Sequence, residues 1–362
     1  MGSTKTTNNT YFFQNKPLFG LDIGNGTLKV MQVDEASIAS HHPAIIGYGT
    51  ANFDKSAVEN GTIVKPEIIA GAILELFKHH LIGDITTRRV ALSIPSYRTF
   101  TRSISLPQLG AKELRAAVEL EAEQYVPVPL DELYLDYTLI RETKEGSEVF
   151  AVGVPKKIVD SYLVLMNLLG LEAVLIETTL SGAGRLFTQD RQSDVTSVII
   201  DFGSASSDIS IFDKTVVVTG TVQAGGVVFS NSIRDKLGVT QAEASIIKTK
   251  YGLGVSKRQK EITESLEPAL QQIIKEIRRM IRYYEERYGT ERPIKQVVTL
   301  GGGANMPGLI EYLTSSLRLA VRPCDPWQYF SYKGLQAPAQ ADKPMFATVA
   351  GLSLVNSKEV LL

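Results

Sequence analysis

One pattern occurs twice in this chain, first as Leu21-Asp22-Ile23-Gly24-Asn25-Gly26-Thr27 and again as Ile200-Asp201-Phe202-Gly203-Ser204-Ala205-Ser206. Each copy is an apolar, β-prone run with an Asp, a hydrophobe, a glycine and small polar residues, and a second apolar run follows. Small turn residues between two such runs predict a β-hairpin. The two aspartates lie 179 positions apart (201 − 22). A motif present in only two copies indicates two similar halves rather than a solenoid.

A third glycine cluster, Gly301-Gly302-Gly303, follows the apolar run Val297–Leu300 and precedes a helical pattern over Met306–Leu317. Glycines before a helix N-terminus let a ligand approach the backbone closely. The N–H groups of a Gly/Ser/Asn turn can hold phosphate oxygens, and an Asp at a strand end can hold Mg²⁺ through its waters. Together the three turns predict a magnesium–nucleotide site.

The rest of the chain alternates between strand and helix patterns. Residues 86–165 show this alternation without any glycine-rich loop, which predicts a small inserted α/β unit. Outside the motifs, helices are predicted over Pro66–Leu81, Ala111–Tyr125, Pro155–Leu169, Thr240–Tyr251, Ser256–Tyr288 and Phe346–Leu354, and strands over Val90–Ile94, Thr101–Leu106, Leu133–Ile140, Glu148–Val154 and Leu171–Ile176.

Composition excludes several classes of protein. A formal net charge of −1 over 362 residues argues against a general grip on nucleic acid. The single Cys excludes a disulfide framework, and four His in two adjacent pairs do not have metal-ligand spacing. Residues 1–17 read as a flexible tail without a signal-peptide pattern, and no run of 18 apolar residues predicts a membrane span. We therefore expect a cytoplasmic protein without direct membrane insertion.

Other known motifs are absent. Neither a Walker A loop nor a dinucleotide fingerprint is present, because Asp22–Thr27 leads into a strand and not a helix. No Ser-His-Asp arrangement has motif support. The residues alone leave both hairpin aspartates open to a second interpretation as plain turn caps.

Three segments carry a family resemblance: Asp22-Ile-Gly-Asn-Gly-Thr-Leu-Lys29, Asp201-Phe-Gly-Ser-Ala-Ser-Ser-Asp208 and Leu300-Gly-Gly-Gly-Ala-Asn-Met-Pro-Gly308. They resemble the phosphate-1, phosphate-2 and adenosine motifs of the actin-like ATPase superfamily, and Phe346–Gly351 is similar to its second connecting helix. The segment Leu114–Leu133, with Glu119-Leu-Glu-Ala-Glu-Gln-Tyr-Val-Pro127, resembles the PilM family of type IV pilus assembly proteins, relatives of the division protein FtsA. The resemblance covers roughly residues 18 to 354.

The resemblance implies an α/β, actin-like (ribonuclease H-like, duplicated) two-lobe fold with an inserted small α/β subdomain. The expected parts are lobe 1 at 18–85 and 166–194, a partner-binding insert at 86–165, the lobe 2 core at 195–225 and 290–362, and a helical subdomain of lobe 2 at 226–289.

ATP and Mg²⁺ are the cofactors that the resemblance implies. Asp22 and Asp201 would face the Mg²⁺ through water from opposite lobes, with Asp208 a further acid near the metal. Lys29 would contact phosphate, with a solvated strand lysine as the alternative. The remaining roles are the β- and γ-phosphates for Gly24, Asn25, Gly26 and Thr27, the second phosphate loop for Gly203, Ser204 and Ser206, the ribose side for Gly225, Gly226 and Lys248, and the adenosine for Gly301, Gly302, Gly303 and Asn305.

One position departs from the family pattern. The adenine-side helix usually carries a glutamate where this chain has Ser245. Glu243 lies two residues earlier, about 160° away around an ideal helix, so it cannot simply substitute.

The implied function is an ATP-binding scaffold of the pilus inner-membrane assembly complex. It would bind the N-terminal cytoplasmic peptide of PilN, couple to pilus motor ATPases and lie peripherally at the inner membrane through its partner. Self-association is a further expectation, and ATP hydrolysis is expected to be slow at most, with no catalytic residue identified. The alternatives are an FtsA-like filament protein, which would need a C-terminal amphipathic helix, and a small-molecule kinase, which would need an Asp base in a substrate cleft.

Overall fold

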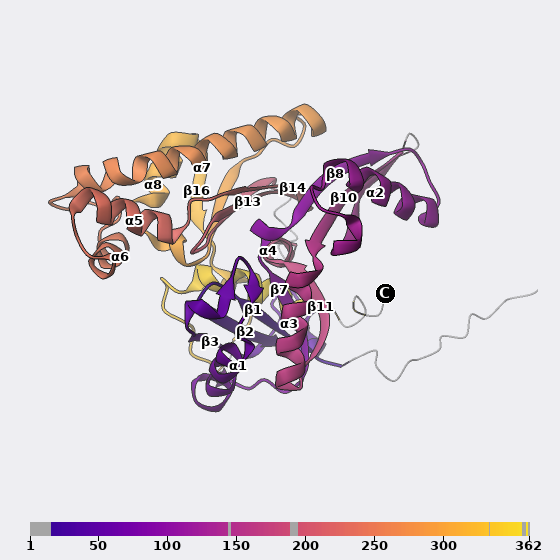
Figure 1. Ribbon diagram of the computed structural model, residues 1–362, viewed down its shortest axis with the longest axis horizontal. Coiled ribbons are helices and arrows are strands. Elements are labelled where there is room, and N and C mark those ends of the chain that lie inside the picture. The colour runs from indigo at the N-terminus through magenta and orange to yellow at the C-terminus, as the bar shows by residue number, and fades with distance from the viewer. Residues whose placement is uncertain (1–15, 144–145, 189–194, 333, 357–359, 361–362) are drawn as a thin grey trace, which may run out of the picture.

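Both predicted hairpins form, and each lies in the middle of its own sheet. The structure is a computed structural model that describes residues 16–143, 146–188, 195–332, 334–356 and 360. Most of the predicted tail at 1–17 lies outside these residues. In Figure 1 the sheet that contains β1 lies below the sheet that contains β13, and we call the two halves lobe 1 and lobe 2.

Lobe 1 has a six-stranded sheet in the order β11-β7-β1-β2-β3-β6. β1 and β2 pair antiparallel as the first hairpin, and β7 runs parallel to β1. β4 (Val58–Glu59) and β5 (Thr62–Ile63) form a separate two-stranded ribbon. The strands of the sheet are β1 (Phe19–Ile23), β2 (Thr27–Val33), β3 (Ile45–Asn52), β6 (Ile82–Gly83), β7 (Arg89–Ile94) and β11 (Glu172–Thr178).

Lobe 2 repeats this arrangement with five strands in the order β14-β13-β12-β15-β16. Its hairpin, β12–β13, takes the place of β1–β2, with β15 parallel to β12 just as β7 is parallel to β1. The predicted duplication is therefore confirmed in strand order and direction. The bounds are β12 (Ser197–Phe202), β13 (Ser207–Asp213), β14 (Thr215–Val222), β15 (Gln296–Leu300) and β16 (Ala320–Pro323).

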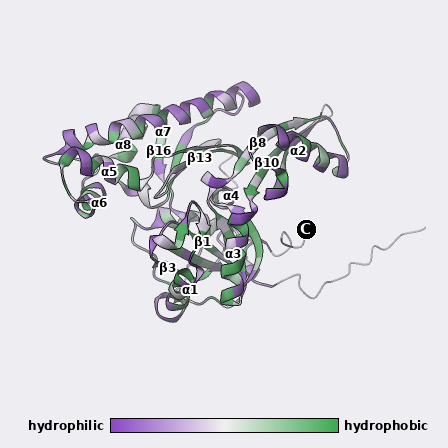
Figure 2. Ribbon diagram, viewed as in Figure 1, coloured by the Kyte–Doolittle hydropathy of each residue, from purple (hydrophilic) through white to green (hydrophobic). Residues whose placement is uncertain are grey.

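Helices cover the sheets with one apolar side each. The 30-residue helix α7 (Gln259–Tyr288) buries a stripe from Ile262 to Tyr284 against lobe 2, while its many hydrophilic residues make it mostly purple in Figure 2. Such a one-sided apolar stripe is what the 3.6-residue period predicts. The other helices are α1 (Pro66–Glu75), α2 (Ala111–Tyr125), α3 (Lys156–Leu169), α4 (Thr179–Phe187), α5 (Gly226–Leu237), α6 (Gln241–Lys250), α8 (Leu309–Leu317) and α9 (Ala347–Leu352).

None of the helices in the described part of the chain is both long enough and apolar enough to cross a bilayer.

The inserted unit is smaller than the predicted segment 86–165. Its three-stranded sheet, β8 (Phe100–Leu106), β10 (Gly146–Pro155) and β9 (Leu133–Thr143), together with α2, spans 100–155. β7 belongs instead to the lobe 1 sheet, and α3 packs against that lobe through Ile158, Tyr162 and Leu165. Alternation of short strands and helices does not reveal which sheet a strand joins, so the sequence placed both boundaries wrongly.

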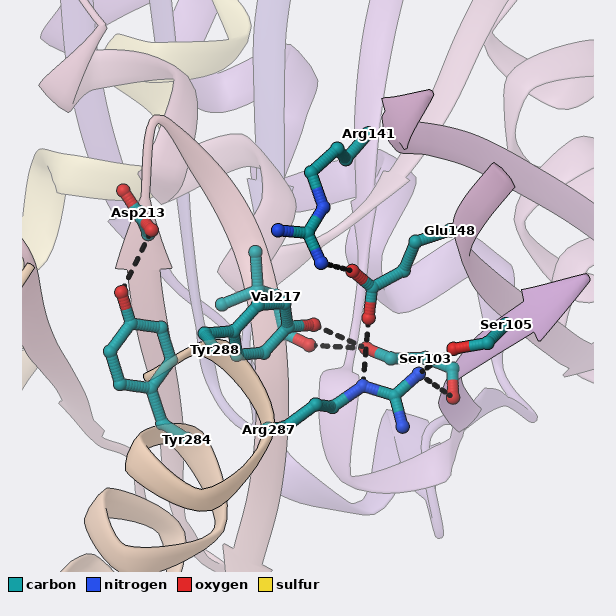
Figure 3. A network of polar contacts seen from close by, with 9 residues as sticks. All are labelled: Ser103, Ser105, Arg141, Glu148, Asp213, Val217, Tyr284, Arg287 and Tyr288. Atoms are coloured by element: carbon teal, nitrogen blue, oxygen red, sulfur yellow. Dashed lines mark hydrogen bonds and ion pairs between the residues drawn. The ribbon is translucent and has the colours of Figure 1, made fainter. Parts of the chain in front are cut away.

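The insert is covalently joined to lobe 1 but rests on lobe 2. Ser103 on β8 donates its hydroxyl to the carbonyl of Val217 on β14 at 2.6 Å. The buried carboxylate of Glu148 on β10 accepts a 2.7 Å bond from Nε of Arg287 and lies 3.5 Å from Arg141, as Figure 3 shows. Because a buried carboxylate is costly unless paired, these contacts hold the insert on the end of α7.

Near the C-terminus, the chain returns to lobe 1. Although 290–362 was predicted to belong to the core of lobe 2, α9 packs against α4 and against β1. A Cβ on Gly351 would overlap the carbonyl oxygen of Gly182, so the two helices cross in direct backbone contact. The prediction was wrong for this segment because its small apolar residues fit either lobe. The two crossing helices lie between the sheets, where they connect the lobes.

Replacing Gly351 by Ala is predicted to destabilise the protein by about 1–3 kcal/mol, because α4 and α9 must move apart to make room for the methyl group. Denaturant unfolding would measure this loss. Gly71→Ala in α1 is the matched control, since a Cβ there would meet nothing within 4 Å. It should leave stability unchanged or raise it by about 0.5–1 kcal/mol. Equal stabilities of the G351A variant and the wild type would contradict the crossing.

Candidate functional site

The first hairpin places an acid opposite a base. Asp22 and Lys29 are register partners on β1 and β2, and Nζ of Lys29 lies 2.9 Å from Oδ2 of Asp22. The other carboxylate oxygen accepts a 2.6 Å bond from the hydroxyl of Ser93 on β7. Both members of the ion pair are buried. Lys29 is therefore not a solvated strand lysine, and it neutralises Asp22.

The second hairpin places an acid opposite an acid. Asp201 and Asp208 are register partners on β12 and β13, at the positions that Asp22 and Lys29 occupy in lobe 1. Like charges directly opposite each other on two strands destabilise a hairpin. Thr221 on β14 donates to Asp208 at 2.7 Å, and the backbone N–H of Tyr97 from lobe 1 donates to the same carboxylate.

Burial raises the pKa values of both acids in this hairpin. Burial in the cleft raises the pKa of Asp208 to about 7, with a further contribution from the charge of Asp201. Burial also raises the pKa of Asp201 to about 6, and the charge of Asp22 from the other lobe adds to the shift. In both cases the buried position disfavours the ionised carboxyl, so negative charge is costly at this point of the fold.

Two glycines allow the backbone to come close to the acids. Gly301 has φ 77°, and a side chain there would overlap Oδ1 of Asp201. Gly26, in the turn of the first hairpin, has φ 130°, which side chains rarely tolerate. In contrast, a Cβ on Gly302 would meet nothing within 4 Å, so its bare backbone is open to the cavity.

The first residues of α5 bond to the turn of the second hairpin, Gly203–Ser206. The N–H groups of Gly226 and Val227 donate to the carbonyls of Gly203 and Ser204, both at 2.9 Å. A Cβ on Gly225 would lie 2.5 Å from the carbonyl oxygen of Ser204. The contact explains this glycine by packing alone.

Between the lobes lies a cavity of about 920 Å³ that both hairpins and the third glycine cluster line. Most of the predicted site residues meet there, although hundreds of positions separate the first from the last. Those on the cavity wall are Asp22, Gly24, Asn25, Gly26, Thr27, Lys29, Gly203, Ser204, Ser206, Gly226, Lys248, Gly301, Gly302 and Gly303, together with Asp201 and Asp208.

Two predicted residues do not line the cavity. Gly225 lies behind the second loop, as described above. Asn305 ends the short turn Gly302–Asn305 and donates its amide to the carbonyl of Ala341, so its side chain is engaged with a loop. Glu243 is also engaged, because it accepts from the N–H of Thr240 at 2.8 Å and caps α6, whereas Ser245 lines the cavity.

Sequence reasoning missed several residues of the site. Ser93 could have been found as the lone polar residue in the buried run Val90–Ile94, on a strand parallel to the one that carries Asp22. Thr221 and Tyr97 gave no motif signal. Lys55 also lines the cavity, but it lies after the first hairpin in the sequence and belongs to no recognisable motif.

A family model described as "Type IV pilus assembly protein PilM" matches residues 20–357. The chain belongs to the PilM family. A solved "PilM-PilN type IV pilus biogenesis complex" is similar at 22% identity and TM-score 0.78, with coverage of 93% of this chain and 97% of that one.

More distant solved structures share the fold. Ethanolamine utilization protein EutJ from Carboxydothermus hydrogenoformans is 16% identical with a TM-score of 0.55, covering 94% of this chain and 89% of that one. MreB 5 of Spiroplasma citri bound to AMPPNP is 13% identical with a TM-score of 0.52, covering 93% and 94%. The expected actin-like fold and the PilM family are thus confirmed, and the chain is an actin-like scaffold of type IV pilus assembly.

Stability should depend on the acid pair of this PilM-family cleft. Because both folded-state pKa values lie above that of an unfolded Asp, folding favours the protonated carboxyls. This stability is present below about pH 4 and is lost as pH rises to about 7. Asp208→Asn should therefore unfold less readily than wild type at pH 8, by about 1–3 kcal/mol, and similarly to it at pH 4.

Urea unfolding of the ligand-free protein across pH 4–8 would measure this difference. Asp131→Asn in the insert is the matched control, since Asp131 is exposed. If the stability difference between D208N and wild type does not change with pH, the acid pair is not repulsive.

Proposed function

We propose that this PilM-family chain binds ATP with Mg²⁺ in the cavity between its lobes. The observation that carries the proposal is the pair of opposed acids in lobe 2, because their unfavourable charge calls for a cation. No three acidic, His or Cys side chains in the described part of the chain are grouped to ligate one metal directly. This supports contact through water, which Mg²⁺ prefers to keep.

The glycine turns supply the other half of the fit. Open backbone at Gly302 and the close approach at Gly301 leave room for a flat group against the third cluster. Gly24–Thr27 and Gly203–Ser206 offer short backbone turns from opposite lobes, which suits phosphate oxygens. Mg²⁺ would supply charge neutralisation between the acids and the phosphates. Asp22, Asp201 and Asp208 would orient its water shell, and Lys29 would stay paired with Asp22.

Asp22→Asn should weaken Mg·ATP binding about 10- to 100-fold, the usual effect of losing a group that orients a metal's ligands. Asp22→Ala should abolish binding. Calorimetry on the full chain with and without Mg²⁺ would test this. The difference between D22N and wild type should appear only with Mg²⁺, and circular dichroism would confirm folding. Unchanged affinity of D22N in Mg²⁺ would refute the metal role of Asp22.

For the insert, we propose that it binds the N-terminal cytoplasmic peptide of a PilN-type partner. Support comes from the solved PilM–PilN complex, which shares the fold. The insert also carries large exposed apolar side chains, Leu120 on α2 and Leu139 on β9. β9 is an edge strand, and edge strands accept extended peptides as an added strand. Through such a partner the protein would lie at the inner membrane.

Leu120→Glu should weaken binding of that peptide about tenfold or more, because it places a charge in an apolar contact. Fluorescence anisotropy with a labelled synthetic tail peptide would measure it. Leu74→Glu on α1 is the matched control, since Leu74 is equally exposed but belongs to lobe 1. If both variants bind as wild type does, the peptide binds elsewhere.

Contacts with pilus motor ATPases and self-association stay predictions. We propose that ATP serves here as a ligand that joins the lobes, with hydrolysis slow at most.

A further inference from the structure

Lys55 reaches the cavity from lobe 1. It begins the short turn Lys55–Ala57 after β3, and its stem covers the first phosphate loop, because a Cβ on Gly26 would lie 2.8 Å from Cγ of Lys55. Its neighbour Asp54 accepts the N–H of Ser56 at 2.8 Å and so caps the turn. The nearest acid in sequence is thus engaged with the backbone.

Lys248 reaches the same cavity from lobe 2. It lies on α6, and its Nζ donates to the carbonyl of Gly226 at 2.8 Å, at the start of α5. Burial lowers the pKa of Lys248, and the charge of Lys55 lowers it further. Both lysines therefore line one cavity, although they belong to different lobes.

Neither lysine has an ion-pair partner within the described ranges, whereas Lys29 of the first hairpin and Arg141 of the insert do. Two like charges that face one cavity from opposite lobes repel each other. An anion between them would turn this repulsion into attraction on both sides. The anion would have to carry charge at more than one oxygen to contact both amines at once.

We propose that Lys55 and Lys248 form a two-sided cation clamp that draws the lobes together on the phosphate chain of a bound nucleoside triphosphate. This inference rests on the proposed nucleotide function and adds a residue, Lys55, that belongs to no motif. The clamp responds to phosphate charge, because each charge-assisted hydrogen bond is about twice as strong as a neutral one. Nucleotides with fewer phosphates gain less from it.

The first test compares Lys55→Gln with wild type by calorimetry in Mg²⁺, using ATP, ADP and AMP. Loss of one charge-assisted contact should weaken ATP binding about tenfold, ADP binding less, and AMP binding less than about twofold. Lys65→Gln is the matched control, because Lys65 is on the same segment and exposed but bonds Ser56 instead of lining the cavity. K65Q should bind all three nucleotides as wild type does.

The second test needs no nucleotide. Lys55→Glu should form an ion pair with Lys248 across the empty cleft and raise the melting temperature by about 2–4 °C. Adding Lys248→Gln should remove this gain. Lys65→Glu should leave the melting temperature unchanged, and K55E should also lose ATP affinity more severely than K55Q.

The outcomes separate the two proposals. If wild type binds Mg·ATP but K55Q binds it equally well, the clamp is wrong and the nucleotide function stands. If K55E and K65E melt at the same temperature as wild type, Lys55 and Lys248 do not face each other and the clamp is again wrong. If wild type binds no nucleotide at all, the proposed function fails and the clamp fails with it.

Discussion

The pairing of two buried acids, Asp201 and Asp208, across one hairpin is the constraint that sets the electrostatics of the cleft. The same register position holds an ion pair in lobe 1, Asp22 with Lys29, and two acids in lobe 2. Duplication thus produced two hairpins with one geometry and opposite electrostatics. In the lobe 1 hairpin the acid is paired with a lysine of the same hairpin. The lobe 2 hairpin has two acids in register, so a positive charge that balances them must come from outside the hairpin. A folded protein keeps such an unfavourable pair when the site has a use for it.

The rest of the structure brings the two hairpins face to face. In each lobe a strand runs parallel to the first strand of the hairpin, β7 beside β1 and β15 beside β12. Ser93 on β7 and the glycines after Leu300 on β15 therefore lie near the aspartates of their own hairpins. The crossing of α4 and α9 through Gly182 and Gly351 sets how closely the sheets can approach. Backbone contact at this crossing leaves little room for adjustment, because protein interiors are close-packed. The cavity between the lobes is therefore a product of helix packing as much as of its own walls.

Local pattern predicted the elements that carry their own signal. Both hairpins, α2 and most cavity residues followed from glycine, Asp and periodicity, and the motif resemblance led to the fold. The predictions that failed were those that depend on contacts between residues far apart in the sequence. β7 and α3 were assigned to the insert because a strand's sheet depends on partners far along the chain. Lys55 and Tyr97 reach the cavity only through the tertiary fold. The electrostatic difference between Lys29 and Asp208 becomes visible only once strand register is known.

The insert leaves lobe 1 near Thr99 and returns at Pro155, yet its side chains hold β14 and α7 of lobe 2 (Figure 3). It therefore forms a strut between the two lobes. Any rotation of one lobe against the other must either slide Ser103 along β14, break the contacts of Glu148, or bend the strut itself. Tyr97, at the root of this strut, touches Asp208 directly. Binding of a partner protein to the strut would consequently depend on the angle between the lobes, although the partner would not contact the cleft.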